Sequence, residues 1–241
     1  DPLEKTKKIY QYVQDNTRYI SVQLGIGGWM PIDATEVDRV KYGDCKGLTN
    51  YTKALLKSQG IESYYSVVWA GDSKRSIESD FASMEGNHVI LNVPHDGKDI
   101  WLECTSQNIP FGFLSTFTDD RDVLVVTPSG GVVKHTDAYL NETNSKITVA
   151  SFEITEDGGL QGNVEIKSSG VQYDRHSRIY GLSEKKRDEY YKEYWDNING
   201  LKIDEISLEN NKNEVLFVEK MVVEARGFAS KIGKELLFKP N

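Results

Sequence analysis

Two apolar runs separated by an Asp-Gly pair constrain the fold of this chain more than any other feature. The first run covers residues 88–93, the second covers residues 100–105, and Asp96 and Gly97 lie between them. An Asp-Gly pair between such runs is a strong signal for a β-hairpin with a two-residue turn. The sequence therefore predicts that the two runs pair as an antiparallel hairpin.

The register of this hairpin decides which polar side chains share a face. With the turn at the Asp-Gly pair, Glu103 faces Ile90 and His88 faces Thr105. Because side chains alternate along a strand, His88 and Glu103 then share one face as diagonal neighbours, roughly 7–8 Å apart, and Cys104 points to the other face. A three-residue turn would instead place His88 opposite Cys104 and move Glu103 to the opposite face.

The clearest helix signal begins at Cys45. Residues 45–57 carry apolar and aromatic side chains at helical spacing, and Gly60 ends the segment. Unpaired N–H groups and the positive end of the helix dipole surround the first turn of a helix, and both favour a thiolate, the form of cysteine that attacks carbonyl groups. A cysteine at this position is also often simply buried, so the helix start alone does not define a site.

Cys45, His88 and Glu103 supply a nucleophile, a base and an orienting acid in chain order. A thiolate nucleophile needs a base, and the base needs a group that orients its ring. Glu103 lies in an apolar strand, where a buried carboxylate requires a partner, and His88 is its nearest candidate. The three side chains are therefore candidates for a catalytic Cys-His-Glu triad, while a structural role remains the commoner one for a single histidine at the start of a strand.

The rest of the first half mixes helices and strands. A helix is predicted to begin at Pro2, with Asp1 as its cap, and to fade near residue 15. Residues 29–40 show little periodicity and are predicted to form a loop. Strands are predicted at residues 19–24, 61–69 and 123–127.

The hydrophobic pattern changes in the second half of the chain, so the chain is predicted to contain two domains, residues 1–142 and 143–241. Its 241 residues exceed the usual size of one domain. Alternating strands dominate after residue 143, and one helix is predicted from Ser183. The second domain is thus predicted to be a smaller β-rich unit with one helix. Strands are predicted at residues 147–155, 160–167, 201–208, 214–223 and 236–238.

Composition narrows the function. The net charge is −8, with 29 basic and 37 acidic residues, which disfavours nucleic acid as a partner. No apolar run is long enough for a membrane span. Two cysteines are too few for a disulfide scaffold. The chain shows no leader at its start, which leaves open a cytoplasmic protein or a piece cut from a longer precursor.

Three segments together resemble the bacterial transglutaminase-like superfamily, which has a papain-like α+β core. They are Tyr-Gly-Asp-Cys-Lys at 42–46, Asn-His-Val-Ile at 87–90 and Trp-Leu-Glu-Cys-Thr at 101–105. The family pattern is a Gly-Asp/His-Cys helix start, a His-led strand and an Asp in the next strand, and this chain has Glu103 at that third position. The resemblance covers roughly residues 1–130. It implies a Cys-bearing helix packed on an antiparallel sheet, with Cys45, His88 and Glu103 as the triad.

The resemblance also guides the prediction of an oxyanion site. The backbone N–H of Cys45 is one candidate donor, and papain-like enzymes often add a glutamine upstream. Gln23, just before a glycine-rich turn, fits that role, and Trp29 is a further candidate. A Gln on a solvent-facing strand is an equally good interpretation of this position.

The predicted function is a cysteine enzyme that acts on amide bonds of a protein or peptide substrate, as a peptidase-like hydrolase or an acyltransferase, with no cofactor. A catalytically silent domain of the same fold, serving adhesion, scaffolding or protein and glycan binding, is the alternative. A third possibility is an interaction face formed by the aromatic residues at 190–195. The spacing of the Cys and His residues matches no zinc pattern. The second half resembles modules of secreted or periplasmic proteins, which implies that location and a larger multidomain protein.

Overall fold

The computed structural model describes residues 1–22, 25–83 and 85–239. The chain divides into two compact units, Asp1–Tyr139 and Leu140–Asn241. The predicted boundary between the two domains lay three residues later, between residues 142 and 143. None of the helices in these described ranges has the length and apolar character that crossing a membrane requires. Each unit is described by itself below.

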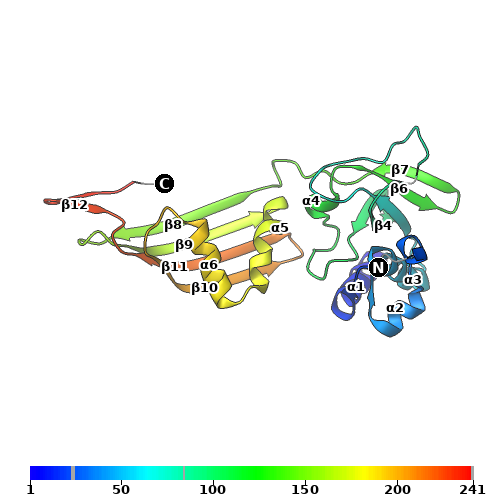
Figure 1. Cartoon of the computed structure of the whole chain (residues 1–241), viewed down its shortest axis with the longest axis horizontal. Helices are drawn as coiled ribbons and strands as arrows, with labels where there is room; N and C mark the ends of the chain where they lie inside the picture. The colour runs from blue at the N-terminus through cyan, green and yellow to red at the C-terminus, as the bar shows by residue number, and fades with distance from the viewer. Residues whose placement is uncertain (23–24, 84, 240–241) are drawn as a thin grey trace. The chain divides into compact units, whose positions relative to one another are not determined.

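The first unit combines helices with an antiparallel sheet of strand order β5-β4-β3-β6-β7 (Figure 1). This arrangement confirms the predicted α+β class. The strands are β3 (Tyr64–Val68), β4 (His88–His95), β5 (Lys98–Leu102), β6 (Asp122–Thr127) and β7 (Gly130–His135), with a short parallel pair β1 (Arg18–Tyr19) and β2 (Tyr42–Gly43). The helices are α1 (Pro2–Asn16), α2 (Ala34–Val40), α3 (Cys45–Ser58) and α4 (Ser115–Thr118), with a 3₁₀ turn at Gly25–Gly28.

The hydrophobic core of this unit joins α1 and α3 to the β4–β5 hairpin. Tyr10 of α1 and Leu48 and Leu56 of α3 are buried against Leu91 of β4 and Leu102 of β5. Burying each such side chain contributes about 1.5–3 kcal/mol, so this packing holds α3 firmly on the sheet. The predicted packing of the Cys-bearing helix on an antiparallel sheet is therefore confirmed.

The hairpin register is the predicted one. Val93 pairs with Ile100 and His95 with Lys98, so the turn is the Asp96-Gly97 pair. Asp96 and Gly97 both have positive φ, 49° and 75°, as a tight turn of this kind demands. The three-residue turn is excluded.

The predicted strand at residues 100–105 was too long, because the ladder ends at Leu102. Its last pair is Leu91 with Leu102. The Glu103 carboxylate accepts hydrogen bonds from the backbone N–H and the hydroxyl of Thr105, which folds residues 103–105 into a turn. Such local side-chain hydrogen bonds compete with strand pairing. Glu103 therefore follows β5 rather than lying within it.

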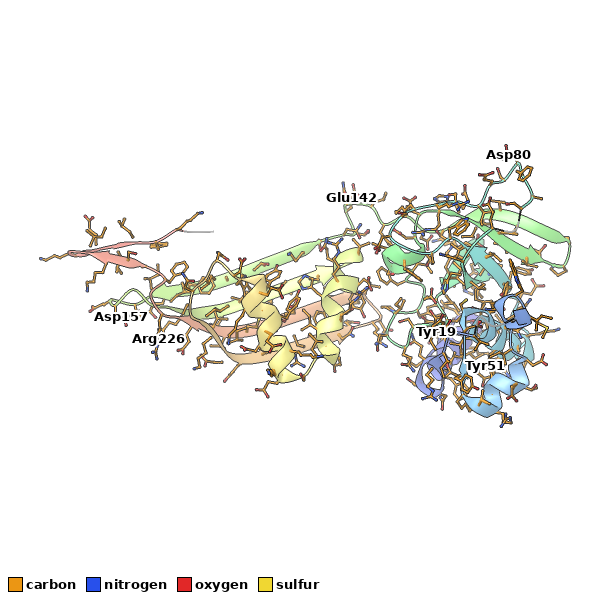
Figure 2. The ribbon with its side chains drawn as sticks, viewed as in Figure 1. Tyr19, Tyr51, Asp80, Glu142, Asp157 and Arg226 are labelled. Atoms are coloured by element: carbon orange, nitrogen blue, oxygen red, sulfur yellow. The ribbon has the colours of Figure 1, made fainter. Side chains whose placement is uncertain are left out.

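Two further predictions in this unit were wrong. Residues 29–40 include the helix α2, which packs by a single buried apolar side chain, Val37, and so leaves no periodic stripe in the sequence. The strand predicted at 19–24 pairs only through Arg18 and Tyr19. The N–H of Ile20 makes one further hydrogen bond, of 2.9 Å, to the carbonyl of Gly43, next to Tyr19, which is labelled in Figure 2. Residues 23 and 24 lie outside the described residues.

The second unit is an antiparallel sheet of order β10-β11-β9-β8, with helices covering one face (Figure 1). The Asp157 turn, labelled in Figure 2, joins β8 to β9. One helix was predicted here, and the structure adds α5, whose seven residues bury too few side chains to give a clear pattern. The elements are β8 (Lys146–Ile154), β9 (Leu160–Ser169), α5 (Val171–Ser177), a 3₁₀ turn at Arg178–Gly181, α6 (Glu184–Tyr194), β10 (Leu201–Asn211), β11 (Leu216–Ala225), β12 (Ser230–Ile232) and β13 (Glu235–Leu237).

The aromatic side chains of α6 belong largely to the core of this unit. Tyr191 is fully buried, and Tyr190, Tyr194 and Trp195 pack partly buried against the same cluster. Stacked and edge-to-face contacts join the four rings. Tyr191 points into the core, so it cannot take part in the interaction face that the sequence suggested at residues 190–195.

The second unit contains a buried polar network that the sequence did not predict. It includes His176, for which the sequence shows no evident partner. Its Nδ1 lies 2.8 Å from the Glu219 carboxylate, which also accepts a hydrogen bond of 2.7 Å from the Tyr191 hydroxyl. All three side chains are buried. A buried carboxylate without partners would be costly, so these hydrogen bonds stabilise the helix layer on the sheet.

Changing Tyr191 to phenylalanine is expected to lower the free energy of unfolding of the second unit by about 1–3 kcal/mol. The ring still fills its place in the core, but the Glu219 carboxylate loses one of its two partners. Urea denaturation followed by far-ultraviolet circular dichroism measures the change. An unchanged midpoint would show that the hydroxyl does not stabilise the buried carboxylate.

Candidate active site

The first turn of α3 is held by the side chain of Asp44. This carboxylate accepts a hydrogen bond of 2.9 Å from the N–H of Gly47 and forms an ion pair with the amine of Lys46. A Cβ on Gly43 would lie 3.3 Å from the N atom of Leu48, so the chain passes close to the helix start at this glycine. The cap and the close approach place Cys45, which is 6% exposed, at the N-terminus of the helix.

The structure brings His88 and Glu103 into direct contact. His88 begins β4, Glu103 follows β5, and Nε2 of the ring lies 2.8 Å from Oε2 of the carboxylate. The Glu103 side chain is 1% exposed, and its other oxygen bonds Thr105. Glutamate is one methylene longer than the aspartate of the family pattern, and the extra length lets it reach His88 from beyond the end of the strand.

Cys45 completes this chain of contacts. Its thiol lies beside the imidazole of His88, where hydrogen bonding and charge interaction with Cys45 both contribute to raising the pKa of His88. Because Nε2 faces Glu103, the other ring nitrogen, Nδ1, is available to the thiol. The three residues that the sequence predicted as a triad therefore form one connected line, Cys45–His88–Glu103.

The electrostatics of the line favour a charged histidine. Burial by itself lowers the pKa of His88, but the charge of Glu103 and the hydrogen bonds with Cys45 and Glu103 outweigh it and raise the pKa well above 6.5. Burial likewise works to raise the pKa of Glu103, and the His88 charge with the hydrogen bonds from His88 and Thr105 holds it below 4.5. Near neutral pH the pair is thus an imidazolium and a carboxylate, an arrangement that stabilises a neighbouring thiolate.

Cys104 is not part of this line. It is a free thiol, as is Cys45, and it packs in the hydrophobic core of the first unit. Burial raises the pKa of the Cys104 thiol to about 12, although hydrogen bonds with Thr52 and Thr49 lower it in part. This position is consistent with the prediction that Cys104 lies apart from the site. The raised pKa keeps the Cys104 thiol protonated and therefore unreactive.

Three residues at the site were not predicted. The ring of Phe117 on α4 meets His88 edge to face, with centroids 5.3 Å apart. Tyr65 of β3 lies beside Cys45: burial chiefly raises the pKa of its phenol, and the charges of Cys45 and Asp44 add to the effect. No sequence signal could reveal these neighbours, because β3 and α4 come together with Cys45 and His88 only in the folded sheet.

The third unpredicted residue is Arg121, whose side chain is fully buried. Its guanidinium donates to the backbone carbonyls of Trp69 and Gly71, just after β3, and of Thr116 in α4. Burial lowers the pKa of Arg121, and the nearby Asp119 and Asp120 oppose this effect. Arg121 thereby ties the segment after β3 to the helix that carries Phe117.

The predicted oxyanion residue, Gln23, lies outside the described residues. Trp29 is within them, and its side chain is 68% exposed. Over the described ranges, the His, Cys, Asp and Glu side chains form no group suited to hold a metal ion.

An α+β domain with a cysteine-bearing helix on an antiparallel sheet, and a histidine and a carboxylate beside the cysteine, defines the class of papain-like cysteine folds. Residues 1–108 match the family model of the Transglutaminase-like superfamily. Over residues 1–108, the first unit is therefore similar to the transglutaminase-like superfamily.

Other comparisons gave less. A sequence comparison with curated proteins found no significant match. Among solved structures, the chain is similar to a protein from Parabacteroides distasonis that is described as a candidate protease, with 11% sequence identity and a TM-score of 0.43. The match covers 94% of this chain and 46% of that one, so the chain spans less than half the length of this structural relative.

Proposed function

We propose that the first unit is a cysteine-dependent enzyme that cleaves or transfers the acyl group of amide bonds in a protein or peptide. The observation that carries the proposal is the line of contacts from Cys45 at a helix start, through His88, to the buried Glu103. A buried histidine and carboxylate can also form a structural pair, as His176 and Glu219 do, and the feature that distinguishes His88 is the thiol of a helix-start cysteine beside its ring. The match of residues 1–108 to the superfamily model supports the same class of chemistry.

In the proposed reaction, the thiolate of Cys45 attacks the carbonyl carbon of the amide. The C–S bond forms as the carbonyl π electrons move to oxygen, and in this proposal the N–H of Cys45, at the helix start, stabilises the oxyanion. The oxyanion collapses, the C–N bond breaks, and the His88 imidazolium gives its proton to the leaving amine. A thioester and a neutral His88 remain.

The second half of the reaction restores the enzyme. Water or a primary amine attacks the thioester while His88 takes a proton from it, and the C–S bond breaks to release the Cys45 thiolate beside the new imidazolium. Water gives hydrolysis, and an amine gives acyl transfer. Throughout, the Glu103 carboxylate accepts a hydrogen bond from Nε2 of His88, and it balances the charge of the ring whenever His88 is an imidazolium.

Iodoacetamide at pH 6 is expected to label Cys45 and to leave Cys104 unmodified in the folded chain. An ordinary thiol is almost wholly protonated at this pH, whereas a thiolate paired with the His88 imidazolium reacts. The raised pKa of His88 keeps the imidazolium charged at pH 6 and at neutral pH, so the expected labelling rate changes little between pH 6 and 7.5. Peptide mass spectrometry after timed quenching measures both thiols.

Cys104 serves as the internal control, because it is equally buried and lacks the histidine. In urea, Cys45 should lose its reactivity at pH 6, Cys104 should remain unreactive at that pH, and both thiols should react near pH 8.5. Equal and slow labelling of the two thiols in the folded chain at pH 6 would refute the activated site and favour a catalytically silent domain.

A substrate panel separates hydrolysis from acyl transfer. Glutamine-containing and unmodified peptides are incubated with the chain, with and without a fluorescent primary amine. Cleaved peptide or released ammonia without amine incorporation identifies a hydrolase. Fluorescent peptide that depends on Cys45 identifies an acyltransferase.

We also propose that the chain belongs to a larger protein that acts in the periplasm or outside the cell. The support is the resemblance of the second half to accessory modules of such proteins. Cell fractionation with an antibody against the second unit tests the location, and the mass of the detected band tests the length of the natural protein.

A further inference from the structure

The strand β8 is an open edge of the sheet in the second unit. In the described part of the chain it pairs with β9 alone, so along its other side alternate N–H and C=O groups have no strand partner. Its pairing with β9 runs in unbroken register from Lys146 to Ile154. Ile147, Val149 and Phe152 are 54%, 61% and 45% exposed, so the edge is also apolar.

The opposite edge of the same sheet is protected. The outer strand β10 contains a register shift between Ile203 and Glu205, and it carries Lys202 and Asp204, which form an ion pair, together with Glu209. Bulges and charges of this kind are the means by which proteins block unwanted strand pairing. The strand β8 has neither device in its middle, since its charged residues, Lys146 and Glu153, lie near its ends.

An apolar cavity of about 330 Å³ lies along β8, on the face of the sheet that bears the helices. Alternate side chains of the edge strand line it, namely Thr148, Ala150, Phe152 and Ile154. Trp195, just after α6, and Phe228, just after β11, form other parts of its wall. The groove is thus continuous with the open edge, because the same strand supplies both.

Beyond Thr148, the strand β8 ends in a polar pair that lies outside the groove lining. The amine of Lys146 donates a hydrogen bond of 2.6 Å to the Tyr194 hydroxyl and lies 5.0 Å from the centre of the Tyr194 ring. Its charge is thereby held beside α6, which leaves the middle of β8 free of charge. A ligand that follows the strand would meet this polar pair at one end and apolar side chains along the rest.

We propose that β8 and its groove form a docking site for an extended segment of a partner protein, which adds to the sheet as a further strand. The unpaired backbone groups of β8 supply the hydrogen bonds, and the groove takes every second side chain of the segment. An extended segment is the occupant that satisfies both features, since a helix or a free lipid chain would leave the edge groups unpaired. The partner segment is therefore expected to alternate apolar residues, facing the groove, with polar residues, facing the other side.

The test selects short random peptides displayed on phage against the immobilised full chain, with counter-selection against the variant Ala150→Lys. Ala150 is exposed and lines the groove, so lysine there places a charge in it without burying that charge in the core. The expected outcome is enrichment of peptides with apolar residues at every second position. No enrichment over the counter-selected variant would overturn the proposal.

Fluorescence anisotropy with an enriched peptide then compares two matched variants. Ala150→Lys is expected to weaken binding about tenfold or more, and Ser151→Lys, the same charge on the opposite face of the strand, should change it less than about twofold. A peptide with alternate N-methylated amides should lose binding. Equal losses in both variants, or full binding of the N-methylated peptide, would overturn strand addition.

Sedimentation of the chain at increasing concentration distinguishes a partner segment from a second copy. A monomer over the whole range supports the proposal. A dimer that Ala150→Lys abolishes would assign the edge to self-association and would overturn it. Circular dichroism and the thermal midpoint confirm that both lysine variants fold as the parent does.

Discussion

Replacing Cys45 with alanine is expected to abolish amide hydrolysis and acyl transfer while both units stay folded. The covalent step needs the thiolate, and alanine offers no nucleophile in its place. The loss should exceed about four orders of magnitude in kcat/KM, because members of a catalytic unit act together. The side chain is small and sits at a helix start, so the thermal midpoint should move by only a few degrees. Peptide turnover and circular dichroism measure the two effects.

Cys104→Ala is the matched control for this variant. It removes the other thiol from the core of the first unit, so it should lower stability yet leave the rate of the remaining folded protein unchanged. Full activity of Cys45→Ala on substrates that the parent turns over would exclude the cysteine mechanism. Loss of activity in Cys104→Ala without loss of stability would show that Cys104, and not Cys45, is the thiol that the reaction needs.

Glu103→Gln is expected to lower kcat/KM by about two to four orders of magnitude with little change in fold. The amide oxygen can still accept from Thr105, which directs the NH₂ group toward Nε2 of His88. Nε2 must then act as an acceptor, so the ring carries its proton on Nδ1, the nitrogen available to the thiol, in the wrong tautomer for a base. Without the carboxylate charge, burial dominates and the pKa of His88 falls.

The pH dependence gives this variant its signature. Because the His88 pKa falls, the imidazolium is lost at a lower pH, and labelling of Cys45 by iodoacetamide at pH 6 should slow together with turnover. Asp99→Asn is the control: it changes another carboxylate of the same hairpin, one that bonds Lys134 and Asn92. A Glu103→Gln protein with unchanged turnover would show that another group orients His88.

Local signals explain what the sequence could predict. The Asp96-Gly97 pair determined the hairpin register because both residues adopt positive φ in the turn. That register, with the chain geometry after it, brought Glu103 to His88. Cys45 was found because the helical spacing begins there and Gly60 follows the end of the helix, signals that depend on the helix itself.

Other features depended on contacts between distant segments. The end of β5 at Leu102 follows from hydrogen bonds of Glu103 to Thr105, which compete with a strand that propensity alone would continue. The short helices α2 and α5 bury too few side chains to leave a periodic pattern. Phe117 reaches His88 only through a fold that Arg121 helps to hold, so neither could be found from spacing.

The strand β5 ends at Leu102, so the segment that carries Glu103 is not held by strand pairing. Hydrogen bonds from the first helix, α1, hold it instead. The Tyr10 hydroxyl donates to the backbone carbonyls of Glu103 and Ile109, and the amide of Gln14 donates to those of Ser106 and Ile109. The segment that carries Glu103 is thus fastened from α1, which contributes no reacting group. A fragment that preserves the candidate site must therefore begin before Tyr10, because a truncation that keeps Cys45, His88 and Glu103 but removes α1 leaves the segment of Glu103 without these hydrogen bonds.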